Sequence, residues 1–325
     1  MINFALRRLT VVVFLLLAVT FVTFLLIEIA PGNPLDRYRA NPQISNELVN
    51  KIEAEYGLDD PVLVQYWNWL TRVVQGDMGY SFNHQRSVTP LVWDRFGNTV
   101  FLMLASILLT WLLALPMGIY CAVNQYSWGD QILSVFAFVG MSIPNFFFCF
   151  LLLYLASLTG NWPLSGMTSF NYQDLSLYGK AVDLFQHLLI PVVVIATAAM
   201  ARLQRITRGN LLEILRKQYI TMARARGLPE NRVIYVHALR NAINPLITLF
   251  GYQFTTLISG AALVEIIVSW PGMGSLMLSA VRSQDQFLVV GVVLASGVLL
   301  ILGNLIADIL LTLVDPRISY REANS

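Results

Sequence analysis

The sequence predicts an all-α integral membrane protein with six transmembrane helices. Hydrophobic residues make up 56% of its 325 residues and charged residues only 12%, so most of its surface cannot face water. Apolar runs of about the 20 residues needed to span a bilayer recur six times. They lie at about 9–29, 99–123, 132–158, 185–201, 246–268 and 288–314.

The first run is interpreted as a retained helix over residues 1–29. Arg7 and Arg8 precede an apolar stretch that is longer than the core of a secretory signal, and no small-residue cleavage site follows it. The run at 185–201 is short, and we expect its helix to continue beyond Arg202. Pro116, Pro144, Pro191 and Pro245 mark expected kinks.

The basic residues near the helix ends predict the orientation, because such residues gather on the cytoplasmic side. Six spans place the basic residues before the first helix, between the fourth and fifth, and after the sixth on one side. Both termini are therefore expected in the cytoplasm. The basic residues on this side are Arg7, Arg8, Arg202, Arg205, Arg208, Arg216, Lys217, Arg224, Arg226, Arg232, Arg240, Arg317 and Arg321.

Residues 30–95 are expected to form a segment on the outer face. Asp60 is a predicted N-cap with Pro61 at the first helical position, and an apolar stripe follows before Gly76. This helix suits a membrane interface or a lid, and covering helix ends and gating both remain open. The stripe comprises Leu63, Tyr66, Trp67, Leu70 and Val74, with Trp69 beside it.

The sequence argues against catalysis and against nucleotide binding. His84, His187 and His237 fall in separate parts of the predicted topology, and no phosphate-binding loop or nucleophile motif is visible. Cys121 and Cys149 lie in apolar runs and are interpreted as buried thiols. A net charge of +2 gives no indication of a nucleic-acid partner.

Polar residues within the spans are candidates for functional groups because they are costly there. Glu28 and Glu265 lie at outer helix ends, from which they can reach the interface. Asn304 and Asp308 share one face of the last helix and are interpreted as packing or cavity-lining groups.

Three arginines follow the fourth span at intervals of three residues: Arg202, Arg205 and Arg208. Attraction to anionic lipid is sufficient to explain them without any protein partner.

The polar segment Tyr219–Pro245 stands out in this apolar chain. A short helix is predicted over Gln218–Arg226, ended by Gly227 and kept from continuing by Pro229. A second helix is expected to end at Asn244–Pro245. Such an exposed, abruptly ended helix is suited to contact another protein.

This segment resembles the cytoplasmic EAA loop of bacterial ABC importer permeases, in the version of the dipeptide/oligopeptide/nickel family. The chain departs from the general pattern at Thr221 and Met222 and in the distance from Gly227 to Pro245. The matching residues are Tyr219, Ala223, Arg224, Ala225, Gly227, Leu228, His237, Ala238, Leu239, Arg240, Asn241, Ala242 and Pro245.

Landmarks along the whole chain resemble the first permease of such a pair. They are Leu6–Arg8, Ala30–Pro34, Tyr56–Asp59 with Pro61, Gln65 and Tyr66, Gly76–Asp77 and Gly79, Ser142–Pro144, Leu164–Gly166, Glu265 with Ser269–Gly274, and Asp315–Arg317.

The resemblance implies a type I ABC importer permease fold in one domain. Its parts would be the first helix, the outer segment, a core over 96–316 that contains a coupling loop at 202–245, and a cytoplasmic tail at 317–325. The implied site for an ATPase comprises Tyr219, Thr221, Ala223, Arg224, Ala225, Gly227 and Leu228. The implied outer docking or gating residues are Glu265, Trp270, Pro271, Gly272 and Gly274.

The resemblance also implies the partners and the reaction. A homologous second permease, two ATPases that hold ATP and magnesium, and an external substrate-binding protein would complete a bacterial inner-membrane importer, with no cofactor on this chain. Peptides are the expected substrates, and nickel chelates or other small solutes remain alternatives. An ion-coupled secondary transporter or channel is the rival class, for which only Asp308 offers an embedded carboxylate.

Overall fold

The protein is described here by a computed structural model that covers residues 2–30, 35–40 and 45–314. Within these ranges the side chains at 2–9, 36–37, 46, 248–249, 251–252, 254–260, 307–308 and 310–314 are not described. Pro31–Pro34, Asp315–Arg317 and the expected tail at 317–325 therefore lie outside the described residues. The chain forms two compact units, one of Met1–Thr99 with Pro271–Ile301 and one of Val100–Trp270 with Leu302–Ser325.

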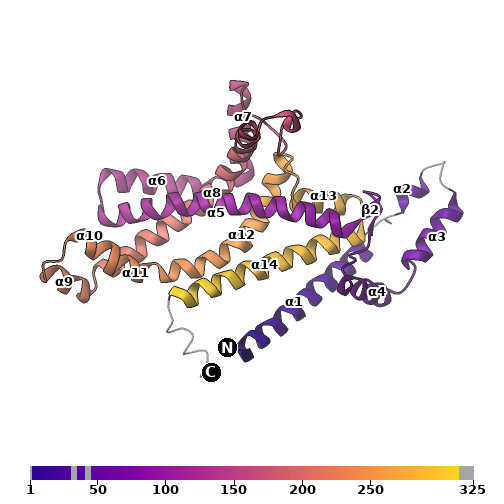
Figure 1. The fold of residues 1–325 in the computed structure, drawn as a ribbon, viewed down its shortest axis with the longest axis horizontal. Coiled ribbons are helices and arrows are strands. Elements are labelled where there is room, and N and C mark those ends of the chain that lie inside the picture. The colour runs from indigo at the N-terminus through magenta and orange to yellow at the C-terminus, as the bar shows by residue number, and fades with distance from the viewer. Residues whose placement is uncertain (1, 31–34, 41–44, 315–325) are drawn as a thin grey trace. The chain divides into compact units, whose positions relative to one another are not determined.

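The first unit contains the N-terminal helix, the predicted outer segment and parts of two long helices (Figure 1). Phe24, Trp69, Val88 and Leu288 come from four different helices and are buried in one cluster. The elements are α1 (Ile2–Ile29), α2 (Asp36–Arg39), α3 (Asn46–Tyr56), α4 (Val62–Val74), β1 (Tyr80–Ser81), β2 (Arg86–Ser87), the start of α5 (Val88–Val123), α13 (Met273–Arg282) and the start of α14 (Gln286–Val314).

Helix α4 confirms the predicted amphipathic helix but corrects its start and its buried face. Pro61 occupies the N-cap position without a side-chain hydrogen bond, so the expected cap at Asp60 is wrong. Trp69 is buried and donates from Nε1 to the Met78 carbonyl at 3.1 Å, whereas Trp67 is 64% exposed. The helix thus packs through a neighbouring stripe, because the rings of Tyr66 and Trp69 both contact Phe24 of α1.

A short antiparallel hairpin pairs Tyr80 with Ser87 and Ser81 with Arg86, and a buried carboxylate fixes it. Asp285 accepts hydrogen bonds from Ser81 Oγ at 2.6 Å and from the Asn83 amide at 3.1 Å. Burial raises the pKa of Asp285 despite these donors.

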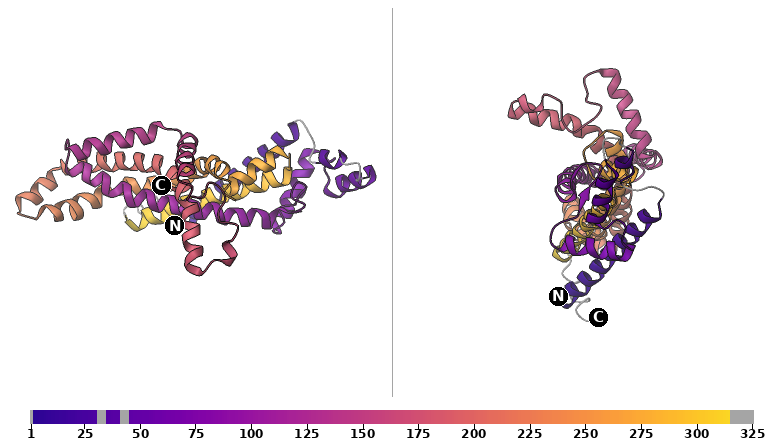
Figure 2. Two further views of the ribbon diagram at one scale, coloured as in Figure 1. Left: turned by 90° about the horizontal axis from the view of Figure 1, so that it is seen from above. Right: turned by 90° about the vertical axis from the view of Figure 1, so that its right-hand side faces the viewer.

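The second unit holds the remaining helices, and α6, α7, α9, α11 and α12 contact α8. Figures 1 and 2 show α6 and α8 running side by side, and these two helices are in direct contact. The elements are the rest of α5, α6 (Trp128–Ser142), α7 (Asn145–Thr159), η1 (Tyr172–Asp174), α8 (Leu177–Leu215), α9 (Gln218–Ala225), α10 (Glu230–Arg232), η2 (Val233–Ala238), α11 (Leu239–Ala242), α12 (Asn244–Ile267) and the end of α14.

The apolar run at 132–158 is not one straight helix. Helices α6 and α7 meet at an angle of 105° across a break at Ile143–Pro144. Pro144 has extended backbone before α7, as expected from its missing amide and its clash with a preceding helical turn. By contrast, α5 and α8 continue through Pro116 and Pro191.

Four helices in the described part are long and apolar enough to cross a membrane: α1, α5, α8 and α14. The bent pair of α6 and α7 raises this to as many as five. The run predicted at 246–268 does form α12, but many of its side chains are not described. The fourth predicted span extends as helix to Leu215, as expected.

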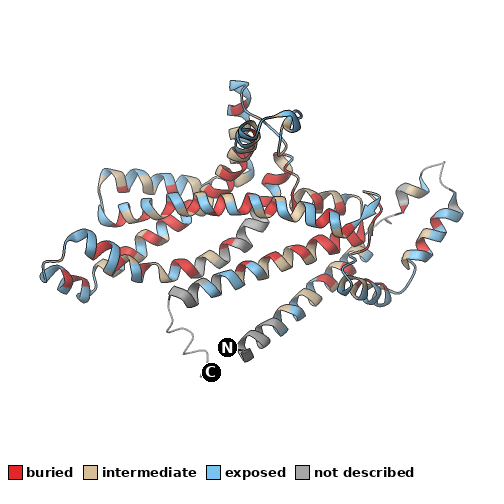
Figure 3. Cartoon of the chain, viewed as in Figure 1, coloured by how far each residue is buried: buried red, intermediate tan, exposed pale blue. Residues whose placement is uncertain are grey.

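Large apolar residues are exposed on the helices of the second unit. Figure 3 colours exposed positions pale blue along these helices. On α6 and α7 they include Phe136, Phe138, Phe147 and Phe150. Many exposed apolar residues on a helix are expected where it faces lipid or another apolar surface. This agrees with the predicted membrane class.

Candidate functional site

Helix α9 is ended by backbone hydrogen bonds that only a left-handed residue allows. Gly227 has a φ of +76° and its amide donates to the Arg224 carbonyl at 2.9 Å. The next amide, of Leu228, donates to the Ala223 carbonyl at 3.4 Å. This pair of bonds is the Schellman motif, and it confirms the predicted stop at Gly227.

The inner face of α9 is packed into an apolar cluster. Ile220 is 0% exposed and Ala223 is buried, and both meet Leu211 of α8 and Val233 of η2. Leu228 packs against the same cluster directly after the turn. Since a fully buried Ile contributes about 1.5–3 kcal/mol, this packing fixes α9 more firmly than its eight residues could alone.

The outer face of α9 carries the remaining residues of the predicted coupling site. Tyr219, Thr221, Arg224 and Ala225 are exposed, as is Gly227 at the turn. This face therefore presents one aromatic side chain, small and polar side chains, and the exposed glycine turn.

Two polar contacts connect this outer face to the return segment. Arg224 contacts Glu230 through Nε–Oε2 at 3.1 Å and Nη2–Oε1 at 2.5 Å. This hydrogen bonding lowers the pKa of Glu230. Asn241 Nδ2 donates to Tyr219 Oη at 3.0 Å. Both contacts hold the returning helix beside α9.

The return segment differs from the single helix that was expected. It begins at Glu230 after Pro229, passes through the π-helical η2, and ends at Ala242 with α11. Pro245 does not end this helix, because it lies in the first turn of α12, where a missing amide costs nothing. The sequence carries no recognisable signal for the π-helical turn.

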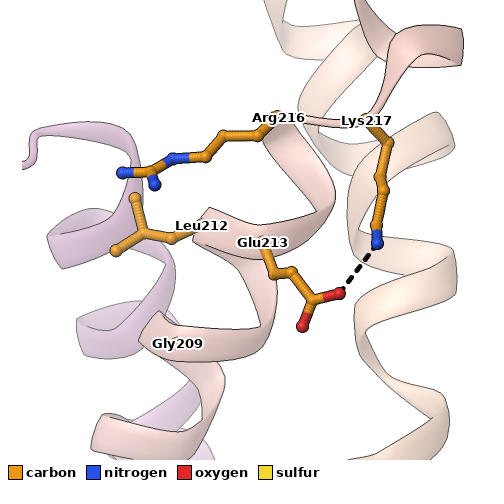
Figure 4. Close-up of a pocket in the computed structure, with 5 residues that line it drawn as sticks. All are labelled: Gly209, Leu212, Glu213, Arg216 and Lys217. Carbon is orange, nitrogen blue, oxygen red and sulfur yellow. Dashed lines mark hydrogen bonds and ion pairs between the residues drawn. The ribbon is translucent and has the colours of Figure 1, made fainter.

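A shallow, open pocket of about 470 Å³ lies on α8 just before α9 (Figure 4). Glu213 and Lys217 pair at 2.8 Å across one turn and form one side of it. The lining residues are Gly209, Leu212, Glu213, Arg216 and Lys217. The pocket therefore combines the apolar side chain of Leu212 with exposed charged side chains just before α9.

The predicted outer residues in the second unit are buried. Glu265 is 1% exposed and Trp270 is fully buried, and the Trp270 amide donates to the Glu265 carbonyl at 2.8 Å. The expectation that Glu265 reaches the interface is therefore wrong within this chain. Nearby, the Gly166 amide donates to the Val268 carbonyl at 2.8 Å, which ties the 160–176 loop to the end of α12.

The other predicted outer residues belong to the first unit and are fixed by α5. Asn98 Nδ2 donates to the Pro271 carbonyl at 2.8 Å, and the Met273 amide donates to Thr99 Oγ1 at 2.8 Å. Gly272 is buried and Gly274 half-buried. These bonds hold the start of α13 in a defined position.

The predicted polar pair on the last helix is only partly described. Asn304 is half-buried on α14. Asp308 lies on the same helix, but its side chain is outside the described residues.

Besides Asp285, two buried carboxylates of the second unit were not predicted from the sequence. Asp130 on α6 pairs with Arg208 on α8 at 2.7 Å, so Arg208 is not a lipid-facing arginine as first interpreted. Asp183 on α8 accepts hydrogen bonds from both the amide and the hydroxyl of Ser169. The spacing of Ser127 and Asp130 at the start of α6 resembles a capping pair, and this spacing was the sequence signal that could have pointed to Asp130.

Comparisons with known proteins agree with this architecture. The family model for the binding-protein-dependent transport system inner membrane component matches residues 114–320, and the N-terminal model for such membrane components matches residues 1–103. The oligopeptide transport system permease protein AppB of Bacillus subtilis is 39% identical over 98% of this chain and 99% of its own length.

Two further relatives are similar over nearly their whole length. The dipeptide transport system permease protein DppB of Escherichia coli is 34% identical, over 99% of this chain and 100% of its own. The di/tripeptide transport system permease protein DppB of Pseudomonas aeruginosa is also 34% identical, with the same coverage.

Proposed function

We propose that this chain, which belongs to the family of inner membrane components of binding-protein-dependent transport systems, forms half of the peptide pathway of an ABC importer. The family is one of membrane permeases and not of enzymes, so the energy comes from elsewhere. The single observation that carries the assignment of mechanism is α9, an exposed helix held rigidly at both its inner face and its end.

Helix α9 is proposed to be the coupling helix for an ATPase. The contact surface would be Tyr219, Thr221, Arg224, Ala225 and Gly227, while Ala223 and Leu228 anchor the helix from behind. A rigid helix transmits displacement better than a flexible one, because less of the motion is lost in bending. Packing carries this load, since an exposed pair such as Arg224–Glu230 contributes only about 0–1 kcal/mol.

The proposed assembly has two homologous permeases, two ATPases and an external substrate-binding protein. ATP and magnesium would be held by the ATPases, and this chain would hold no cofactor and bind no nucleic acid. The basic residues around α9 support a bacterial inner-membrane orientation with both termini and α9 in the cytoplasm. Membrane lipid would cover the exposed apolar helix faces.

Peptides are the proposed substrates. The relatives described above are permeases for oligopeptides, dipeptides and di/tripeptides, and they align over almost the whole chain. Similarity over the full length includes the segments that would line the pathway. The external binding protein would select the peptide before it reaches this chain.

An outer docking or gating role is proposed for the segment around Glu265, in a revised form. Glu265 and Trp270 are buried, so they would position the segment, whereas the half-buried Pro271 and Gly274 are better placed for contact. Gly272 would act through its backbone. Asn304 and Asp308 are proposed to serve packing or to line a cavity.

Copurification from native membranes tests this function. For each tagged copy, the chain should bring down one second permease and two ATPase subunits that carry a phosphate-binding loop. Uptake of a radiolabelled tripeptide into proteoliposomes containing the complex and its binding protein should require internal ATP. Uptake driven by an ion gradient without ATP would instead establish a secondary transporter and end the proposal.

A further inference from the structure

A buried ion pair joins the beginning of α6 to α8, two turns before α8 ends at Leu215. Arg208 Nε donates to Asp130 Oδ1 at 2.7 Å and Arg208 Nη2 donates to Asp130 Oδ2 at 2.8 Å. Asp130 is 2% exposed. Two parallel hydrogen bonds between planar groups fix orientation as well as distance.

Asp130 also organises the loop that precedes α6. Its Oδ2 accepts from the Tyr126 amide at 2.9 Å, and its own amide donates to Ser127 Oγ at 3.2 Å. Tyr126 has a φ of +65°, a backbone conformation that residues other than glycine rarely adopt. The carboxylate therefore holds both the arginine and a strained turn.

The helices around this pair approach one another closely. A Cβ on Gly118 of α5 would lie 2.6 Å from Thr207 Cβ of α8, the neighbour of Arg208. A Cβ on Gly129 would lie 2.6 Å from Tyr120 Cε1. The end of α5, the loop and α8 are thus in van der Waals contact without space for an added methyl group.

The same helix ends support α9. Ala122 at the end of α5 and Leu211 of α8 are buried in one cluster with Ile220 and Ala223 of α9. Arg208 lies three residues before Leu211, on the same stretch of α8. An unbroken path of contacts therefore runs from α9 through α8 to Asp130.

Arg208 differs from the other arginines in its series. Arg202 and Arg205 are exposed, as expected for side chains that reach lipid headgroups. Arg208 is half-buried and directed to Asp130. Lipid attraction accounts for the first two but not for the third.

We propose that Asp130 and Arg208 are positioning residues that make the ends of α5, α6 and α8 move together with α9. Displacement of α9 then reaches α6, and through it the bend before α7, instead of being lost by bending the end of α8. This inference rests on the proposed coupling function of α9. It adds the residues that carry the displacement into the membrane helices.

The test is a distance measurement in the full copurified complex. Spin labels are placed on exposed residues of α6 and α9 through Trp128→Cys and Met222→Cys. The two native cysteines are buried, and the chain without added cysteines gives the labelling background. Distances are recorded without nucleotide and after trapping with ATP and vanadate, alongside stimulation of ATP hydrolysis by the binding protein loaded from a tryptic casein digest.

With Asp130 present, we expect one narrow distance that is the same in both nucleotide states. Asp130→Asn and Arg208→Lys should broaden it, and should lower stimulation about tenfold, the size of a typical coupling between sites. Asp130→Glu keeps the charge but adds a methylene to this tightly packed site, so it should broaden the distance less than Asp130→Asn does. Arg205→Lys, an exposed position on the same helix, is the matched control and should change neither measurement.

Three results would overturn the inference. A distance that remains narrow in Asp130→Asn shows that the pair does not hold the helix ends together. A distance that changes between nucleotide states in the unaltered chain shows that α6 and α9 do not move as one body. Failure of any ATPase to copurify with the unaltered chain removes the coupling function itself, and is distinguished because it precedes any substitution.

Discussion

The amide of Leu228 donates a hydrogen bond to the carbonyl of Ala223 and closes the end of α9. The bond forms because Gly227, between them, adopts a φ of +76°. No heavy atom lies within 4 Å of a Cβ added to Gly227, so a substitution there changes the backbone preference without creating a clash.

Gly227→Val should therefore disrupt the helix end while the membrane helices still assemble. A β-branched residue in a left-handed conformation costs on the order of 1–3 kcal/mol, which is enough to displace a short exposed helix. ATP-driven peptide uptake by the reconstituted complex should fall steeply.

The matched variant is Gly227→Asn, because Asn tolerates the left-handed region much better. It should retain most of the uptake. An equal loss of uptake in both variants would mean that the turn must lack a side chain, and that the helix stop is not what matters. Full uptake by Gly227→Val would remove the coupling assignment.

Ile220→Ala should be far more damaging than Arg224→Gln. The first removes a fully buried side chain and should cost about 2–5 kcal/mol, whereas the second removes an exposed ion pair worth about 0–1 kcal/mol. Limited proteolysis of the α9 segment and thermal unfolding in detergent report the difference. A larger effect from Arg224→Gln on proteolysis would mean that the ion pair, and not packing, holds α9.

Stability should decrease as the pH rises through the folded-state pKa of Asp285. Burial raises that pKa, so the folded protein retains the proton to a higher pH than the unfolded chain does, whose Asp pKa is about 3.9. The protonated Asp285 contributes its full share of the stability below the unfolded-state pKa of about 3.9. This share is lost as the pH rises through the raised folded-state pKa. Thermal unfolding of the protein and of Asp285→Asn across this range should show the slope only in the unaltered protein.

Charge reversal at Glu265 should impair function through position and not through direct contact. Glu265→Lys places a cation where the side chain is 1% exposed, and it should lower stimulation of ATP hydrolysis by the loaded binding protein. Glu265→Gln preserves the shape and should be milder. Unchanged stimulation in Glu265→Lys would exclude this segment from docking and gating.

Gly118→Ala should destabilise the second unit, whereas Gly97→Ala should not. Both glycines are in α5, but an added Cβ meets Thr207 at 2.6 Å in the first case and no heavy atom within 4 Å in the second. Overpacking costs about 1–3 kcal/mol. Thermal unfolding of the two variants in one detergent gives the comparison, and similar midpoints would mean that α5 and α8 separate easily.

Much of the fold follows from one-dimensional signals. Apolar runs predicted the long helices, and Gly227 with Pro229 predicted the end of α9, because both effects act within a few neighbouring residues. The buried face of α4 was not predictable in the same way. Trp67 and Trp69 are equally apolar, and only the placement of α1 decides which one is buried.

Polar contacts between distant parts of the chain were likewise not predictable from the sequence. Asp130 and Arg208 are 78 residues apart, so the sequence alone offers no reason to pair them. Arg208 also continues a regular series with Arg202 and Arg205, which favoured the wrong interpretation. Likewise, Glu265 ends an apolar run and was expected at the surface, but tertiary packing buries it.

The end of α9 is made from main-chain atoms, whereas its exposed face is made from side chains. The exposed side chains that are proposed to contact the ATPase can therefore change one at a time while the end of α9 stays unchanged. In the proposed coupling role, the exposed side chains would decide which ATPase binds, whereas the buried side chains and the main-chain end of α9 would keep the helix stiff. A permease of this design could adapt to a different ATPase without a change in the contacts that hold α9.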